Sequence, residues 1–216
     1  VVVLGFKEIQ NIALGMSVLR MFDAKGSEFM EHLWKHSFCA GVAARMIADH
    51  LALKVEGKYF VAGLLHDVGK IFMSQYVPES FHELLTLMLS SRNLKCYHAL
   101  EESVLGITHQ EVGGILLRSW MFPQEIVDAV AFHHDPASSR LDPVFTFCIH
   151  LADVLCTVKG ITPLKDRHFV AVDRDASARV EGKNGAMTTD DIMALLTRLD
   201  LEIDRQSSYL AAFRRR

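Results

Sequence analysis

The chain has 216 residues, of which half are hydrophobic, and a formal net charge of −3. This length is typical of one domain with a substantial core, and the composition argues against intrinsic disorder and against a broad basic surface for nucleic acid. No apolar run reaches the roughly 20 residues that a membrane span requires. Because Cys39, Cys96, Cys148 and Cys156 form no C-x-x-C pair and follow no secretory signal, they favour reduced thiols over disulfides or a thiolate zinc site.

Apolar residues recur at helical spacing from Gly5 to Trp120, with little of the alternation that is typical of strands. The fold class is therefore predicted to be all-α. Because the chain is apolar from Val1 onward and does not begin with Met, it is expected to be a piece of a longer protein. The predicted helices are 6–22, 28–52, 57–68, 78–91, 98–105, 109–120, 123–134, 143–158 and 189–202.

Several helix starts carry local signals. Thr108 and Glu111 have the spacing of a capping box. Pro123 suits a first helical position, and Asp142-Pro143 combines an N-cap residue with the same preference. These signals divide the chain into the short helices of a bundle.

The C-terminal part is predicted to be organised differently. Charged and small residues dominate 166–185, which indicates a loop with room for a short β element. Beyond it, helix 189–202 carries one apolar stripe. The terminal arginines 214–216 are predicted to be solvated rather than a nucleic-acid patch. We predict one helical domain over 1–160, with 161–216 forming a loop and an amphipathic helix packed on that domain.

Polar residues follow or interrupt three strongly apolar segments. The run 59–65 leads directly into His66-Asp67, and the run 126–132 leads directly into His133-His134. Asp153 lies between two apolar faces of helix 143–158. A buried carboxylate is costly unless a cation or several donors compensate it, so these positions favour a metal site.

Two further histidines fit the same site. His36 lies in the long helix 28–52 with His32 one turn before it, and His109 opens a capped helix. Imidazoles with carboxylates suit Fe, Mn, Zn or Ni, of which Fe or Mn is favoured here. Seven candidate ligands are too many for one tetrahedral zinc, but they suit two octahedral ions that share a bridging carboxylate. Asp67 is the natural candidate for the bridge. The candidate ligands are His36, His66, Asp67, His109, His133, His134 and Asp153.

The segment 63–70 reads Gly-Leu-Leu-His-Asp-Val-Gly-Lys and resembles the G-L-L-H-D-(I/V)-G-K signature of the HD superfamily. The resemblance extends over about 5–159 and is to the HD-related output domain, called HDOD. It implies an all-α HD-superfamily bundle and bacterial signalling, with the usual N-terminal helices of the family missing here. Besides the signature, the residues that carry it are Trp34, His36, Gly113, Trp120, Pro123, His133 and His134.

The order of the ligands is similar to that of the neighbouring HD-GYP phosphodiesterases, although many HDOD members have lost theirs. The resemblance implies that Asp67 is shared by both metals and that Lys70 faces the phosphate. It implies a first metal on His36, His66, Asp67 and Asp153, and a second on Asp67, His109, His133 and His134. No G-Y-P loop follows His134, so cyclic-di-GMP is not indicated.

Three functions compete. The first is a metal-dependent phosphohydrolase or phosphodiesterase with Asp67 and Lys70 as catalytic residues and His32 as an accessory group. The second is a non-catalytic signalling output or scaffold module in which the metals are structural, and the third is a di-iron oxygenase. The expected partners are a phosphate-containing small molecule or nucleotide and a signalling protein. Neither a membrane nor a nucleic acid is indicated, and the expected location is the cytoplasm.

The same residues also have ordinary structural explanations. His66, Gly69 and Lys70 could serve only as helix-terminal cap and dipole partners. Trp34 and Trp120 are predicted to be core or docking aromatics rather than ligand platforms. The histidines outside the motif are predicted to be hydrogen-bonded core residues, namely His50, His82, His98, His150 and His168.

Overall fold

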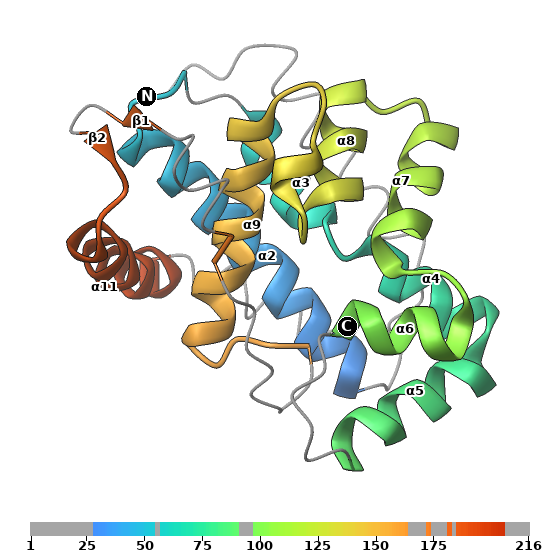
Figure 1. The fold of residues 1–216 in the computed structure, drawn as a ribbon. Coiled ribbons are helices and arrows are strands. Elements are labelled where there is room, and N and C mark those ends of the chain that lie inside the picture. The colour runs from blue at the N-terminus through green and yellow to red at the C-terminus, as the bar shows by residue number, and fades with distance from the viewer. Residues whose placement is uncertain are drawn as a thin grey trace.

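The structure is a computed structural model that describes residues 28–54, 57–90, 97–163, 172–173, 181–182 and 185–205. The prediction of an all-α fold with a short β element near the C-terminus is confirmed (Figure 1). The predicted helix 6–22, the arginines 214–216 and most of the loop 166–185 lie outside the described residues. The helices are α2 (Glu28–His50), α3 (Gly57–Leu65), α4 (Val68–Tyr76), α5 (Pro78–Ser90), α6 (Tyr97–Leu105), α7 (His109–Ser119), α8 (Gln124–Phe132), α9 (Pro143–Val158) and α11 (Thr189–Arg205), with a 3-10 turn at Pro136–Ser138.

Helix α2 is the centre of the bundle. It packs against α3 and α9, and α11 packs on it as well, while α7 packs against α4 and α8. In the view of Figure 1, α11 lies on one side of the α2 and α9 pair and α4 to α7 lie on the other. The antiparallel strands β1 (Glu181–Gly182) and β2 (Gly185–Ala186) form the β element.

Glycine allows α2 and α3 to approach closely. A Cβ atom on Gly41 would lie 2.7 Å from the carbonyl oxygen of Phe60, and one on Gly63 would lie 2.7 Å from that of Ala40. Such distances are impossible for a real side chain, so the two backbones touch here because both positions lack one. This contact fixes the position of the turn that follows α3.

The turn after α3 corrects the predicted helix 57–68. Helix α3 ends at Leu65, and α4, which was not predicted, begins at Val68. The ring Nδ1 of His66 donates a hydrogen bond back to the carbonyl oxygen of Gly63 at 2.7 Å, which satisfies a carbonyl at the helix end. Helix α8 likewise ends at Phe132, two residues earlier than predicted. The other predicted helices that lie within the described residues agree with the structure to within a few residues.

The predicted caps are largely confirmed. Thr108 and Glu111 form a complete capping box at the start of α7. Asp142 accepts a hydrogen bond from the backbone N–H of Phe145, with Pro143 as the first residue of α9. Pro123 is the cap residue of α8 rather than its first helical residue.

The buried apolar residues form two clusters. The larger one joins α2, α3, α8, α9 and α11, and Trp34 and Trp120 pack against it as predicted. The smaller one, which includes Met73, Phe81 and Leu84, lies among α4, α5, α6 and α7.

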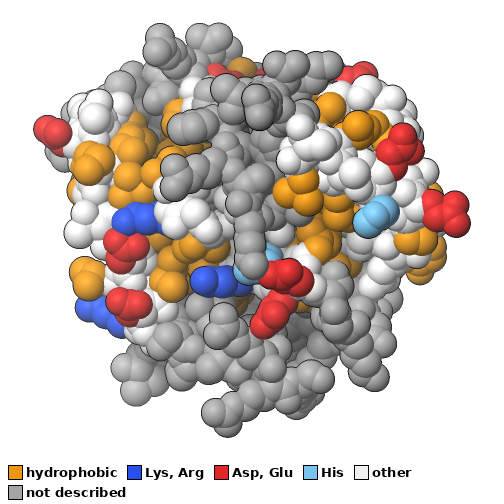
Figure 2. Space-filling view, turned by 90° about the horizontal axis from the view of Figure 1, so that it is seen from below, with side chains coloured by type: hydrophobic (Ala, Val, Ile, Leu, Met, Phe, Trp, Pro, Cys, Tyr) orange, Lys and Arg blue, Asp and Glu red, His pale blue; other side chains and the backbone are white. Residues whose placement is uncertain are grey.

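The described surface that Figure 2 shows is mixed. Lys and Arg side chains lie next to Asp and Glu side chains on this face, and hydrophobic side chains are interspersed among them. Among the residues that the structure describes, no helix is long and apolar enough to cross a membrane.

Candidate metal centre

The structure brings the seven candidate ligands together from five places in the fold. All are buried except His134, which is half-buried. His36 comes from the middle of α2, and Asp153 comes from α9. His66-Asp67 forms the turn between α3 and α4, His109 opens α7, and His133-His134 follows α8.

One group of side chains surrounds the imidazole of His36. Its Nε2 lies 3.2 Å from Nε2 of His66, 3.6 Å from Oδ2 of Asp67 and 3.2 Å from Oδ1 of Asp153. Nε2 of His66 is 3.5 Å from the same Asp67 oxygen. His36, His66 and Asp67 thus offer donor atoms that all lie within 4.8 Å of one another.

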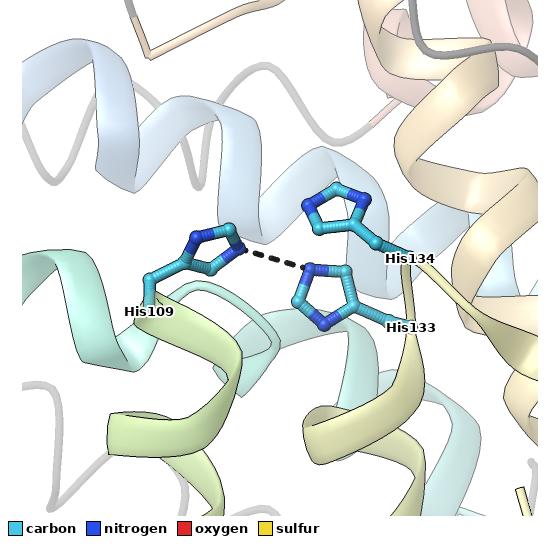
Figure 3. A group of neighbouring side chains, drawn as sticks. All are labelled: His109, His133 and His134. Atoms are coloured by element: carbon cyan, nitrogen blue, oxygen red, sulfur yellow. Dashed lines mark hydrogen bonds between the residues drawn. The ribbon is translucent and has the colours of Figure 1, made fainter. Parts of the chain in front are cut away.

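A second group lies on the other side of Asp67. Figure 3 shows His109 at the start of α7 pointing across to His133, with the ring of His134 beside them. Nε2 of His109 lies 3.2 Å from Nε2 of His133 and 3.4 Å from Oδ1 of Asp67. The two carboxylate oxygens of Asp67 therefore face different groups. Oδ2 of Asp153, in turn, lies 3.9 Å from Nδ1 of His134.

The outer ring nitrogens determine the orientation of the imidazoles. Nδ1 of His36, His66 and His133 lies 2.7 to 2.8 Å from the carbonyl oxygens of Ile161, Gly63 and Val130. A carbonyl oxygen can only accept, so each Nδ1 must carry the proton. In the neutral ring, Nε2 then presents a lone pair to the centre of the site.

The spacing of these donors fits metal coordination. Donor atoms bound to one ion at about 2.1 Å lie roughly 3.0 to 3.4 Å apart, and both Nε2 pairs lie 3.2 Å apart. Two imidazole lone pairs that face each other at this distance repel unless a proton or a metal ion lies between them. Nitrogen and carboxylate donors in this combination suit divalent transition metals.

Burial keeps most of these imidazoles neutral. It lowers the pKa of His133 to about 3, and it also lowers the pKa values of His66, His109 and His134. At His36 burial acts in the same direction, but the adjacent Asp153 and Asp67 carboxylates outweigh it and raise the pKa. The neutral form of imidazole is the one that binds metal.

Lys70 contacts the central carboxylate directly. Its Nζ lies 2.7 Å from Oδ1 and 2.8 Å from Oδ2 of Asp67, and its side chain is 8% exposed. Burial opposes the charge on Lys70, but Asp67 outweighs it and raises the pKa, so the ammonium stays protonated. The two residues form a buried ion pair at the junction of the two groups.

Gly69 explains how α4 and α7 meet at this junction. A Cβ atom on Gly69 would lie 2.0 Å from the carbonyl oxygen of His109. The absence of a side chain lets the first turn of α4 lie against the first residue of α7. This contact brings Asp67 next to His109.

Two buried residues support the site and were not predicted to do so. Oε2 of Glu101 lies 2.6 Å from Nδ1 of His109, and burial raises the pKa of Glu101 to about 8. Nδ1 of His150 donates to the backbone carbonyl of His133 at 2.8 Å. A weak signal for Glu101 existed, because it lies one turn before Val104 and Leu105 on the apolar side of α6.

The remaining histidines vary. His32 is 3.6 Å from Glu28 on the outer part of α2, and it belongs to neither group of candidate ligands. His150 is buried and hydrogen-bonded as predicted, and His50 is partly exposed and contacts Asp191. His82 is exposed, contrary to prediction. His168 and the side chain of His98 lie outside the described part of the chain.

Fold and site together define a helical bundle that presents buried histidines and aspartates to a common centre. The HDOD domain family matches residues 1–136, and the chain belongs to this family. Ribonuclease Y of Thermus thermophilus is 27% identical to it over 133 residues, which are 62% of this chain and 18% of that protein. The chain spans a quarter or less of the length of the curated relatives that it matches.

Solved structures share the fold. A candidate signal transduction protein of Marinobacter aquaeolei superposes with a TM-score of 0.73 at 19% identity, over 98% of this chain and 45% of that chain. A candidate phosphohydrolase of Shewanella amazonensis gives a TM-score of 0.63 at 16% identity, over 98% of this chain and 70% of that chain. At these identities the likeness concerns the fold alone.

Proposed function

We propose that this domain is a metal-dependent phosphohydrolase with a dinuclear centre. The observation that carries the proposal is the pairing of Nε2 atoms at 3.2 Å in both groups. In the pair His36 and His66, and in His133, the hydrogen bond at Nδ1 directs Nε2 inward. These fixed and converging ring nitrogens have the donor arrangement that a bound cation requires.

The distances support one ion in each group, with Asp67 shared between them. Oδ2 of Asp67 faces His36 and His66, whereas Oδ1 faces His109. Fe or Mn is the favoured metal because the donors are imidazole and carboxylate. The first ion would use His36, His66, Asp67 and Asp153, and the second would use Asp67, His109, His133 and His134.

Bound divalent ions polarise a phosphoryl oxygen and lower the pKa of water. The residues of the chain then have separate roles. Asp67 would contribute one carboxylate oxygen to each group. The protonated Lys70 beside it is placed to neutralise an anionic oxygen of a substrate. Lys70 follows Asp67 by three residues, on the first turn of α4, and this spacing keeps its ammonium beside the Asp67 carboxylate.

A phosphodiester is the substrate class that the similarities favour. Ribonuclease Y, by its name, cleaves RNA, which is a phosphodiester. The formal net charge of −3 favours a small phosphodiester or nucleotide over a long polyanion, whose binding depends on many Lys and Arg contacts. The partners of this site are therefore proposed to be small phosphate-containing molecules.

The proposal is tested by metal content and turnover of the same preparation. Elemental analysis should find two transition-metal ions per chain, and loaded protein should hydrolyse a generic phosphodiester. A short RNA and a set of nucleotides serve as further substrates. Protein that holds two metals and yet hydrolyses none of these substrates with Fe, Mn, Zn or Ni would overturn the catalytic function.

One observation favours a second candidate, a signalling module whose site does not turn over substrate. Lys70 already neutralises Asp67 at 2.7 to 2.8 Å, and His36 contacts Asp153 at 3.2 Å. The buried carboxylates thus have partners within the protein itself. A domain built in this way keeps its fold without metals, and partner binding that is equal in the loaded and metal-free protein would support this function.

Metal removal is expected to lower the thermal stability of the domain. A ligand that binds only the folded state at a thousandfold excess over its dissociation constant stabilises by about 4 kcal/mol, which corresponds to roughly 10 °C in the melting temperature at this size. Calorimetry before and after chelation measures the shift. Asp67→Ala, which should bind no metal, is the control, and chelator should leave its melting temperature unchanged. An equal shift in both proteins would show that the chelator acts elsewhere.

A further inference from the structure

Glu101 is a buried carboxylate that is not one of the candidate metal ligands. It lies in α6 and has a relative exposure of 0%, whereas its neighbour Glu102 is exposed. Its Oε2 lies 2.6 Å from the ring Nδ1 and 3.0 Å from the backbone N of His109. Burying a carboxyl group costs free energy unless hydrogen bonds compensate it. Both of these contacts are to His109, which suggests that Glu101 is buried in order to serve this residue.

Helix capping does not explain the contact with the ring. His109 is the first residue of α7, so its backbone N–H lacks a partner within the helix. Thr108 and Glu111 already cap this helix with a complete capping box. The backbone contact of Glu101 adds to that cap, but its contact with Nδ1 does nothing for the helix.

The ring contact does, however, complete a pattern. His36, His66 and His133 each have their outer Nδ1 held by a backbone carbonyl. For His109, Nδ1 is held instead by the Glu101 carboxylate, which comes from a different helix. Its Oε2 can accept from Nδ1–H and from the backbone N–H together, whether or not Oε1 carries a proton.

We propose that Glu101 is a positioning residue that holds Nε2 of His109 toward His133 and Asp67. It fixes the tautomer that can coordinate a metal and also fixes the direction of the ring. Carboxylate partners of this kind typically contribute 10- to 100-fold to metal affinity. The affinity effect rests on the proposed dinuclear centre, and it should fall on the second metal because His109 belongs to that group.

The first test measures metal binding by the 216-residue chain. Glu101→Gln is nearly isosteric, and Glu102→Gln is the matched control on the same helix. Competition with a chelator, using manganese or zinc as the probe, should show that Glu101→Gln binds one of the two metal equivalents about 10- to 100-fold more weakly than the wild type does. The other equivalent, and both equivalents in Glu102→Gln, should be unchanged. Unchanged affinities in a folded Glu101→Gln protein, or an equal effect of the two variants, would overturn the proposal.

The second test needs no metal and separates this inference from the proposed function. Long-range proton–nitrogen correlation spectra of the metal-free protein report which ring nitrogen of His109 carries the proton. The wild type should show the proton on Nδ1, and Glu101→Gln should shift His109 toward a mixture of tautomers. If the wild type bound no metal but this shift occurred, the proposed function would fail and the positioning role would stand. A wild-type His109 protonated on Nε2, or a tautomer unaffected by the substitution, would refute the role itself.

Discussion

Replacing Asp67 with alanine is expected to abolish the binding of both metal equivalents, whereas replacing His133 with alanine is expected to weaken chiefly one. The reason is geometric, because Oδ2 of Asp67 faces His36 and His66 while Oδ1 faces His109. His133 has its Nε2 contact within the second group only. Elemental analysis of the purified variants measures the remaining equivalents.

Asp200→Ala is the control for this comparison, because Asp200 is an exposed aspartate that pairs with Lys159 on the surface. It should retain both equivalents. Circular dichroism establishes that the Asp67 variant is folded before its metal content is interpreted. If the Asp67 and His133 variants lost the same number of equivalents, the centre would hold one ion or two strictly coupled ions, and Asp67 would not be a bridge.

Replacing Lys70 is expected to lower phosphodiester hydrolysis by roughly a hundredfold or more, the scale on which one stabilising group of a transition state contributes. Methionine is the better replacement because Lys70 is buried and alanine would leave a cavity. A protonated lysine is not a metal ligand, so Lys70→Met should keep both equivalents. Rates for the metal-loaded proteins, normalised to metal content, measure the effect, and Lys159→Met should hydrolyse at the wild-type rate.

The same variant separates an effect on chemistry from an effect on the fold. Without metal, Lys70→Met leaves Asp67 buried without its ammonium partner, and breaking a buried pair costs about 3 to 5 kcal/mol. The metal-free variant should therefore unfold at lower denaturant than the metal-free wild type, and metal should restore much of the difference. A Lys70→Met variant that hydrolyses substrate at the wild-type rate would show that Lys70 takes no part in the reaction.

Much of the site could be predicted because its residues are polar and lie within or next to strongly apolar segments of the sequence. His66-Asp67 and His133-His134 end apolar helices, and Asp153 interrupts another. Burial of such residues requires partners, and a shared centre supplies them. The structure brings them together, while their binding of metal stays a prediction.

The parts that sequence reasoning missed depend on contacts between distant segments. Helix α4 was missed because the helical spacing of apolar residues continues up to His66 in the sequence. The hydrogen bond from the ring of His66 to the carbonyl oxygen of Gly63, which marks the end of α3, cannot be read from that spacing. The sequence gives only a weak signal for Glu101, because its burial depends on the approach of α6 to the start of α7. His32 has the helical spacing of a ligand, but position along a helix does not show which part of α2 lies against the centre.

The two groups of candidate ligands also differ little in how much chain they enclose. His36 and His66 are 30 residues apart, and His109 and His133 are 24 residues apart. Each pair joins segments close in sequence, so bringing its members together closes a short loop at a small entropic cost. We expect each half of the centre to be able to form early in folding, from local contacts that are typical of fast-folding helical proteins. Asp153 is far from His36 in the sequence, so their contact closes a longer loop than either histidine pair does. We therefore expect this contact to form after the two pairs.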